Sequence, residues 1–273
     1  MGQPEWTAKA DAIWSVIEKV CAVPDAFEMA NLVPDAFAMD GQGRITPGKY
    51  SSEAAQYLYM WLGITRREAL PNYFRQMFDH FGARPSVPLN TNRRFYISAD
   101  LPVGTAMRFE ALYASGEYRK LYDEITYIFT YMLEHGPGTL WEGWARESNI
   151  NHGYLSHVAV WLSRIFLGLD IPDAVDRTVR IAPHPCGLKW AKGCTVAGSG
   201  LVSVYWVMGD DRFSLEVSVP QGYRVNLTLP DEVYGWDNTL EIGGQTLAIP
   251  PRQKEYPGIG QSFRLSCVKS PRS

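Results

Sequence analysis

The chain has 273 residues, a formal net charge of −3 and a hydrophobic share of 46%. This share is enough for a sizeable core and argues against intrinsic disorder, while interspersed charges without a basic stripe argue against nucleic acid as a partner. No apolar run approaches the roughly 20 residues that a membrane span needs. The first residues lack the basic start and apolar core of a secretory signal. We therefore expect no nucleic-acid or membrane partner, and either a cytoplasmic location or a chain trimmed at its front.

Up to about residue 170 the apolar residues recur mostly at helical spacing. A first helix is predicted over 6–20, and a second runs from a cap at Ser51 or Ser52 to Leu62. Thr65 is the expected cap of a third helix, which Pro71 should kink or restart. Three more helices are predicted over 100–114, 117–135 and 152–167. The pattern therefore indicates about six helices, with a long loop over 136–151 before the last one.

After Pro172 the apolar period becomes two, which is typical of strands. Short β runs bounded by glycine, proline and aspartate turns are predicted over 177–185, 200–210, 212–220, 223–230, 239–250 and 262–269. The segment Gly209–Asp211 reads as the turn of a hairpin. Six or more such strands predict an antiparallel sandwich. We therefore expect an α+β protein with a helical domain over 1–172 and a sandwich domain over 173–273.

The cysteines give no sign of a metal site. Cys21, Cys186, Cys194 and Cys267 include no C-x-x-C pair, so we expect no metal and no cofactor. Buried free thiols are the simpler interpretation, and Cys186 could bridge Cys194 only in an oxidising compartment. Aromatic residues make up 13% of the chain, which suits a carbohydrate binder and an ordinary core alike.

Four motifs together resemble a known family. They are Thr139–Glu142 (TLWE), Asn151–His152, Pro183–Pro185 (PHP) and the strand Gly200–Trp206. This set resembles the C-terminal part of the α-L-rhamnosidases of glycoside hydrolase family 78, over roughly residues 50–235. The resemblance implies part of an (α/α)₆ toroid, the six-hairpin glycosidase architecture, followed by a small β-sandwich. It also implies an inverting hydrolase that acts on a carbohydrate or a glycosylated small molecule.

The resemblance assigns roles to residues of the long loop. Glu142 matches the family's general base, and His152 matches a histidine that contacts the sugar. Trp141 and Trp144 would line the pocket, with Asn151 beside His152, although Asn151 and His152 can also simply cap the next helix. An inverting glycosidase also needs a carboxylic acid ~6.5–9.5 Å from the base.

The general acid has no match in this chain. The family carries it in an upstream segment rich in Asp, Arg and Glu, and no such segment occurs here. Glu147 and Asp100 are the local candidates for a substitute acid, and each can equally be a solvated loop or cap residue. About six helices also fall short of the twelve of a full toroid. We therefore expect a second copy or another chain to cover the exposed helix faces.

Three functions follow from these observations. The first is a glycoside hydrolase, possibly only the C-terminal half of the enzyme. The second is a non-catalytic module that binds sugar or a partner, and the third is a small-molecule biosynthetic enzyme on a reduced hydrolase scaffold. Fold resemblance alone does not separate them. A second carboxylate opposite Glu142 would favour the first function, and a large apolar cavity without one would favour the third.

Overall fold

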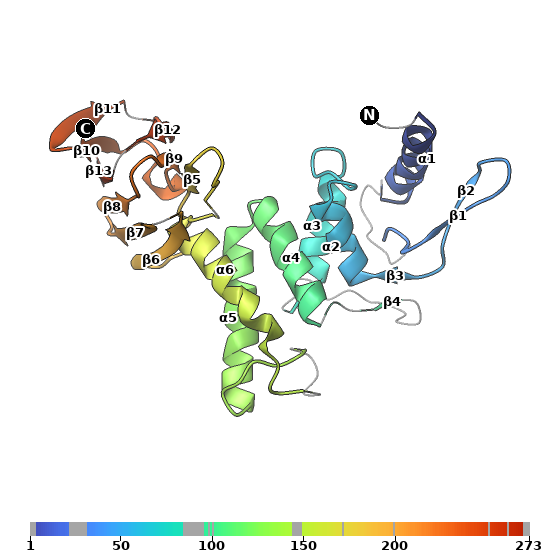
Figure 1. Ribbon diagram of the computed structural model, residues 1–273. Helices are drawn as coiled ribbons and strands as arrows, with labels where there is room; N and C mark the ends of the chain where they lie inside the picture. Colours follow the sequence, from blue (N-terminus) through green and yellow to red (C-terminus); the bar gives the residue numbers. More distant parts are fainter. Residues whose placement is uncertain are drawn as a thin grey trace. The chain divides into compact units, whose positions relative to one another are not determined.

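The computed structural model describes residues 4–21, 32–83, 96–97, 99, 101–143, 149–170, 172–198, 200–250, 252–260 and 262–269. Its contacts divide the chain into two compact units, the helical unit Met1–His157 and the sandwich unit Val158–Ser273 (Figure 1). The described residues contain six α-helices followed by mainly antiparallel sheets, which confirms the predicted α+β class. Within the same residues, no helix combines the length and apolar character that a membrane crossing needs.

The helical unit holds most of the predicted helices. Its helices are α1 (Pro4–Cys21), α2 (Glu53–Trp61), α3 (Pro71–His80), α4 (Pro102–Ala114) and α5 (Tyr118–His135). It also contains short strands, which are β1 (Phe37–Met39), β2 (Ile45–Pro47), β3 (Ser51–Ser52) and β4 (Tyr96–Ile97). β1 pairs antiparallel with β2, and β3 pairs parallel with β4. The sequence pattern did not predict these four strands.

Local chemistry sets the ends of two helices. The Ser52 hydroxyl accepts a hydrogen bond from the backbone N–H of Ala55 at 3.3 Å, so Ser52 caps α2 as predicted. α3 begins at Pro71, because proline has no N–H to lose and its fixed φ suits the first helical position. The expectation that Thr65 caps this helix was wrong, since Thr65 lies in the turn before it with a side chain that is 1% exposed.

The predicted helix over 152–167 is three short segments of different winding. The 3-10 helix η3 (Gly153–His157) is followed by α6 (Val158–Leu162) and the π-helical turn η4 (Ser163–Leu167). Gly168 ends η4 with a φ of 62°, and a Cβ there would lie 2.0 Å from the carbonyl carbon of Ala182. Glycine is therefore required at this end for both its backbone angle and its size.

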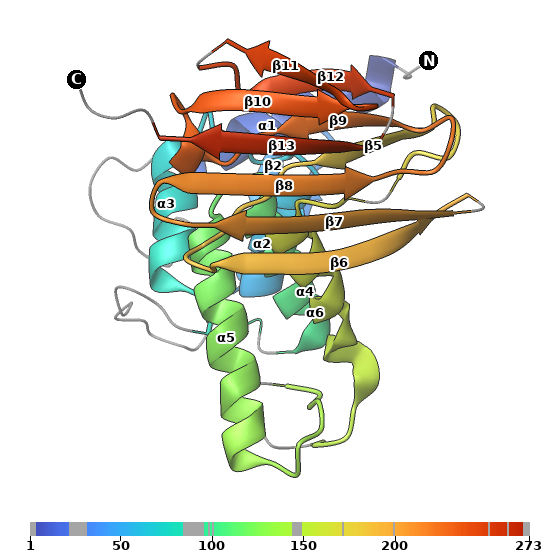
Figure 2. The ribbon, with the colours of Figure 1, turned by 90° about the vertical axis from the view of Figure 1, so that its left-hand side faces the viewer.

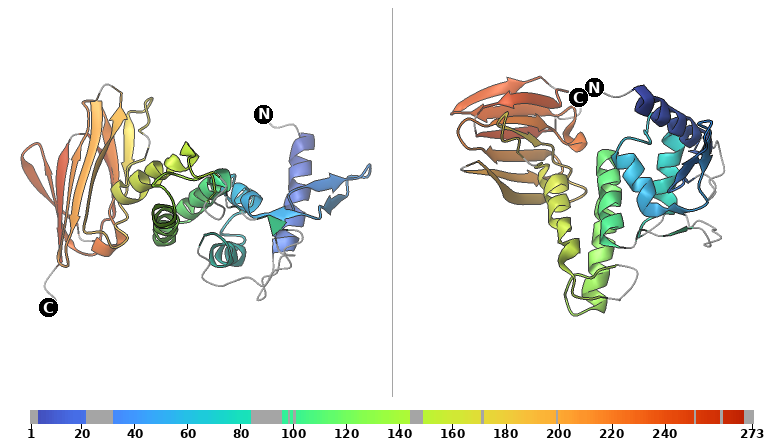
Figure 3. Two further views of the ribbon diagram at one scale, coloured as in Figure 1. Left: turned by 90° about the horizontal axis from the view of Figure 1, so that it is seen from below. Right: turned by 45° about the vertical axis from the view of Figure 1, so that its right-hand side comes forward.

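The sandwich unit contains two sheets, seen as two layers in Figure 3. The larger sheet has the order β11-β10-β13-β8-β7-β6, all antiparallel, and the smaller has the order β12-β9-β5, in which β5 and β9 run parallel. The strands are β5 (Thr178–Ile181), β6 (Trp190–Ala197), β7 (Gly200–Met208), β8 (Arg212–Ser218), β9 (Arg224–Thr228), β10 (Asp237–Ile242), β11 (Gln245–Ile249), β12 (Glu255–Ile259) and β13 (Phe263–Val268). The predicted hairpin is confirmed, because β7 and β8 pair antiparallel and Gly209 N–H donates to the Arg212 carbonyl at 2.7 Å.

Alternation along β7 shows where the sandwich core lies. Val202, Val204 and Trp206 are at most 1% exposed, whereas Tyr205 between them faces solvent. The indole N–H of Trp206 donates to the Phe166 carbonyl at 2.6 Å and so fixes η4 to the larger sheet. η4 therefore belongs to the sandwich unit, although the apolar period of the sequence changes only near residue 172.

His184 makes the sandwich unit sensitive to acid. Burial and, after it, the nearby charge of Arg180 lower the pKa of His184 from 6.5 to about 4. The unfolded chain therefore binds a proton near pH 6.5, while the folded state resists protonation until about pH 4. Stability from neutral His184 is thus present above pH 6.5 and is lost as the pH falls through this window.

We expect acidification from pH 7 to pH 4.5 to cost the parent about 2 kcal/mol more unfolding free energy than it costs His184→Gln. Urea unfolding of the full chain, followed by tryptophan fluorescence at both pH values, measures the difference. Equal losses in the two proteins would show that His184 does not carry this acid sensitivity.

Candidate functional site

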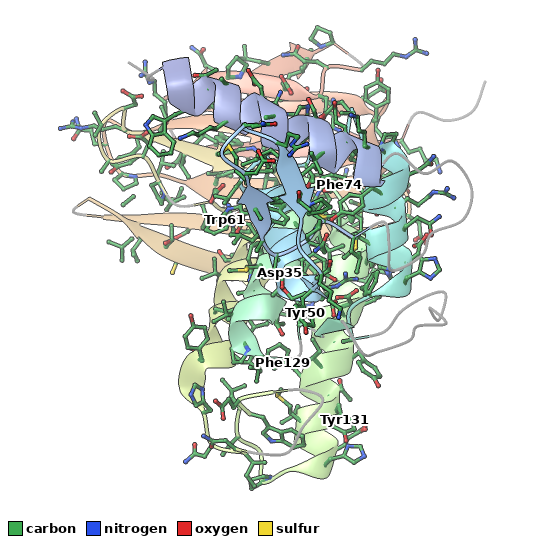
Figure 4. All side chains as sticks on the ribbon, turned by 90° about the vertical axis from the view of Figure 1, so that its right-hand side faces the viewer. Asp35, Tyr50, Trp61, Phe74, Phe129 and Tyr131 are labelled. Carbon is green, nitrogen blue, oxygen red and sulfur yellow. The ribbon has the colours of Figure 1, made fainter. Side chains whose placement is uncertain are left out.

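The loop that follows α5 is anchored by a buried tryptophan. Trp141 is 0% exposed. The ring of Tyr131, which is labelled on α5 in Figure 4, meets the indole ring edge-on at 5.7 Å between centroids. Gly136 lies so close that a Cβ on it would be 2.7 Å from the indole ring. Any larger residue at position 136 would therefore displace Trp141. Aromatic packing and this close approach together hold the loop against the end of α5.

Backbone hydrogen bonds then close the loop. The Glu142 N–H donates to the Asn149 carbonyl at 2.8 Å, and the His152 N–H donates to the Leu140 carbonyl at 2.7 Å. The Thr139 hydroxyl donates to the Ile150 carbonyl. These contacts pair residues 139–142 with residues 149–152 in the manner of two antiparallel strands. Glu142 is therefore held beside the segment that carries Asn151 and His152.

The side chain of Glu142 is available for chemistry. Glu142 is half-buried, and its carboxylate has no hydrogen bond or ion pair to any other described residue. His152 is also half-buried, and its Nδ1 accepts a hydrogen bond from the Tyr154 N–H at 3.3 Å. In neutral imidazole one nitrogen accepts and the other donates, so Nε2 of His152 carries the proton. The loop therefore presents a carboxylate that can accept a proton and an imidazole N–H that can donate a hydrogen bond.

The structure places only some of the other predicted site residues beside Glu142 and His152. Trp141 forms the buried support beneath Glu142, and Asn151 is exposed. Trp144, Glu147 and Asp100 lie outside the described residues. The described part of the loop thus brings Trp141, Glu142, Asn151 and His152 together. Their roles toward a sugar stay predictions.

A buried polar network fixes the helix that carries this loop. Arg108 on α4 makes two hydrogen bonds to the carboxylate of Glu124 on α5, from Nε at 2.7 Å and from Nη2 at 2.5 Å. The two side chains are 3% and 2% exposed. Burial alone would lower the pKa of Arg108, but the charge and hydrogen bonds of Glu124, together with Tyr57 and Glu53, outweigh burial and raise the pKa well above its usual range. Arg108 therefore stays charged and ties α5 to α4.

The network continues to α2 through Tyr57. The Tyr57 hydroxyl lies 2.5 Å from Nη1 of Arg108 and donates to Oε1 of Glu53 at 2.5 Å. The Glu53 carboxylate also accepts the N–H groups of Gly82 and Ala99, each at 2.9 Å. Glu53 therefore holds backbone on both sides of the segment 83–98, in addition to starting α2.

Sequence reasoning missed this network. It interpreted Glu53 only as an acid suited to the helix dipole, yet Glu53 is 4% exposed. Arg108 could have indicated the network, because it interrupts the apolar pattern of residues 102–114. A charged residue on a buried helix face implies a buried partner. The partner's identity depends on how three helices pack, so the sequence pattern could not supply it.

The comparisons with known proteins agree with the motifs. Residues 174–238 match the family described as Bacterial alpha-L-rhamnosidase C-terminal domain. The chain is similar to the C-terminal part of the α-L-rhamnosidases. An α-L-rhamnosidase of Formosa agariphila is 24% identical over 171 residues, which cover 56% of this chain and 18% of that protein. The resemblance stated from the sequence is therefore confirmed, and the chain spans about a fifth of the length of this curated relative.

Solved structures share the fold. An α-L-rhamnosidase from Dictyoglumus thermophilum has a TM-score of 0.64 at 21% identity, covering 81% of this chain and 26% of that one. A family 78 rhamnosidase of Bacillus sp. GL1 has a TM-score of 0.55 at 23% identity, covering 71% and 20%. A Streptomyces avermitilis α-L-rhamnosidase complexed with L-rhamnose has a TM-score of 0.58 at 17% identity, covering 78% and 21%. These likenesses confirm the predicted fold of a partial toroid followed by a sandwich.

Proposed function

We propose that the chain carries the general-base part of an inverting α-L-rhamnoside hydrolase, with Glu142 as the base. One observation carries the proposal. Glu142 is half-buried and its carboxylate has no partner among the described residues, yet its backbone is fixed by the hydrogen bond to Asn149. A structural glutamate in such a position is usually satisfied by hydrogen bonds. The similarity to α-L-rhamnosidases supports the same assignment.

The chemistry follows from the residue types. Glu142 takes a proton from a water molecule, whose oxygen attacks the anomeric carbon on the face opposite the leaving group. The bond from that carbon to the glycosidic oxygen breaks, and the departing oxygen takes a proton from an acid. The product sugar has the opposite anomeric configuration. The Nε2–H of His152 is suited to donate to a sugar hydroxyl, and Asn151 offers a further amide beside it.

The acid is the missing member of this mechanism. Glu147 and Asp100 stay candidates, and a second copy or another chain that completes the toroid is the alternative source. One surface supports such an association. An open groove of about 370 Å³ runs along α5, lined by Tyr122, Thr126, Tyr127, Thr130 and Tyr131 with Arg119, Asp123 and Glu134. Aromatic groups in such number on one helix face suit the packing of further helices.

Hydrolysis of two aryl α-L-rhamnosides tests the proposal. 4-Nitrophenolate leaves without protonation, whereas phenolate needs an acid, so we expect the full chain to hydrolyse the 4-nitrophenyl substrate. If the chain lacks its acid, the phenyl substrate will be hydrolysed at least about tenfold more slowly, because acid catalysis contributes ~10²–10⁴-fold when it operates. Proton NMR of the fresh product should show β-L-rhamnose first.

Two results would contradict the proposal. Appearance of the α-anomer first would exclude inversion. Absence of any turnover by a correctly folded sample would exclude the hydrolase. In that case, retained binding of L-rhamnose would favour the non-catalytic sugar-binding module, and loss of binding would favour the biosynthetic enzyme.

A further inference from the structure

One row of side chains crosses the whole outer face of the larger sheet. The strand register aligns six residues in order across β6, β7, β8, β13, β10 and β11. They are Lys192, Tyr205, Glu216, Arg264, Glu241 and Thr246. All six are exposed, and on β7, β8, β13 and β10 their neighbours along the strand pack into the core. Five steps of about 4.8 Å between strands make the row about 24 Å long.

The row lies in a cavity of about 800 Å³. A second row of small polar residues adjoins it and is formed by Cys194, Ser203 and Ser218, with Ser262 beside them. The hydroxyl of Ser262 donates to that of Ser218 at 3.4 Å. Figure 2 shows this face of the sheet toward the viewer, with the smaller sheet behind it. The outer face is therefore concave and rich in hydrogen-bonding groups.

The charges of the long row balance. It contains two cations and two carboxylates, and Nε of Arg264 lies 3.2 Å from Oε1 of Glu216. Lys192 has its ammonium 6.0 Å from the ring centre of Tyr205. The two carboxylates would repel an anionic ligand, and the two basic groups would repel a cationic ligand. A neutral ligand with many hydroxyls would find donors and acceptors in alternation.

A ligand with many hydroxyls, such as a sugar, also needs a flat apolar surface to stack on, and exposed aromatic rings provide one. Tyr205 is 37% exposed within the row, and Trp190 is 63% exposed on the same face, two residues from Lys192. An exposed aromatic ring offers a flat apolar surface for the C–H faces of a sugar. We propose that this outer face binds a neutral oligosaccharide, with Tyr205 as the stacking platform and the charged row as the hydroxyl contacts. The residues of this face belong to the sandwich unit and Glu142 to the helical unit, and the proposal does not depend on the proposed hydrolysis.

Titration of the full chain with neutral tetrasaccharides of rhamnose, glucose, galactose and mannose tests this proposal by calorimetry. We expect at least one to bind, and a galacturonate tetrasaccharide to bind more weakly. Tyr205→Ala should weaken binding by about tenfold or more, which corresponds to about 1.4 kcal/mol, whereas Tyr205→Phe should retain it. Tyr234→Ala is the matched control, because Tyr234 is a 55% exposed tyrosine of the same unit outside this cavity. Glu142→Gln should leave this binding unchanged.

The cysteines report where the ligand lies. Cys194 is an exposed free thiol in the cavity, while Cys186 is a half-buried cysteine outside its lining. Burial raises the pKa of the Cys267 thiol to about 12, so that thiol should not react. Bound oligosaccharide should slow maleimide labelling of Cys194 and leave the labelling of Cys186 unchanged. The proposal is overturned if no neutral tetrasaccharide binds, if Tyr205→Ala binds as well as the parent, or if Cys194 is not protected.

Discussion

Arg108→Met is expected to lower the free energy of unfolding of the helical unit by about 3–5 kcal/mol, because it leaves the buried carboxylate of Glu124 without its partner. Methionine keeps the apolar stem of arginine but not its guanidinium group, so the loss of the charge and of its hydrogen bonds is joined by some lost packing. The substitution also removes the donor to the Tyr57 hydroxyl. Chemical denaturation of the full chain measures the loss.

An exposed pair on α5 provides the control. Nε of Arg119 lies 3.1 Å from Oδ1 of Asp123, with the two side chains 65% and 44% exposed. Because water screens such a pair, Arg119→Met should cost less than about 1 kcal/mol. Adding Glu124→Met to Arg108→Met should recover part of the lost stability, since both buried charges are then gone. Similar costs for Arg108→Met and Arg119→Met would mean that the buried pair does not hold α5 in place.

The periodic elements of this fold could be predicted from the sequence alone. α5 has a long amphipathic pattern, and β7 alternates strictly between buried and exposed residues. The sequence pattern did not predict β6, because the run WAKGCTVA has few large apolar residues to mark a buried face. The pattern did not predict β12 either, because it contains Pro257. Proline is tolerated in a strand only at the edge of a sheet, which is where β12 lies. The parallel pairing of β5 with β9 depends on the whole topology and has no local signal.

The candidate site was predictable only in part. The motifs at Thr139–Glu142 and Asn151–His152 indicated that the two segments act together, and the backbone bonds between them show how they are joined. Burial of Trp141 under the loop depends on Tyr131 and Gly136, whose roles appear only when α5 and the loop are packed. Arg108 and Glu124 were missed for the same reason. Sequence spacing within one element cannot show a contact between elements.

Glu142→Gln is expected to lower the turnover of 4-nitrophenyl α-L-rhamnoside by about 10²–10⁴-fold, because the amide has the shape of the carboxylate but cannot accept the proton of water. Sugar binding should survive, so the fall should appear in kcat with little change in KM. Tm should stay close to that of the parent, since the carboxylate of Glu142 has no partner among the described residues to lose.

Glu68→Gln serves as the matched control, because Glu68 is an exposed glutamate of the helical unit that does not line the groove along α5. It should leave turnover unchanged. A structural role for Glu142 predicts the reverse pattern, with a lower Tm and nearly normal activity per folded molecule.

The most direct test is the ratio of kcat for the parent and Glu142→Gln on 4-nitrophenyl α-L-rhamnoside, measured on folded samples at one pH. A general base at Glu142 predicts a ratio of about 10² or more, with both proteins binding L-rhamnose. A ratio near one, or a parent that does not turn over the substrate, would contradict the assignment of Glu142 as the water-activating base.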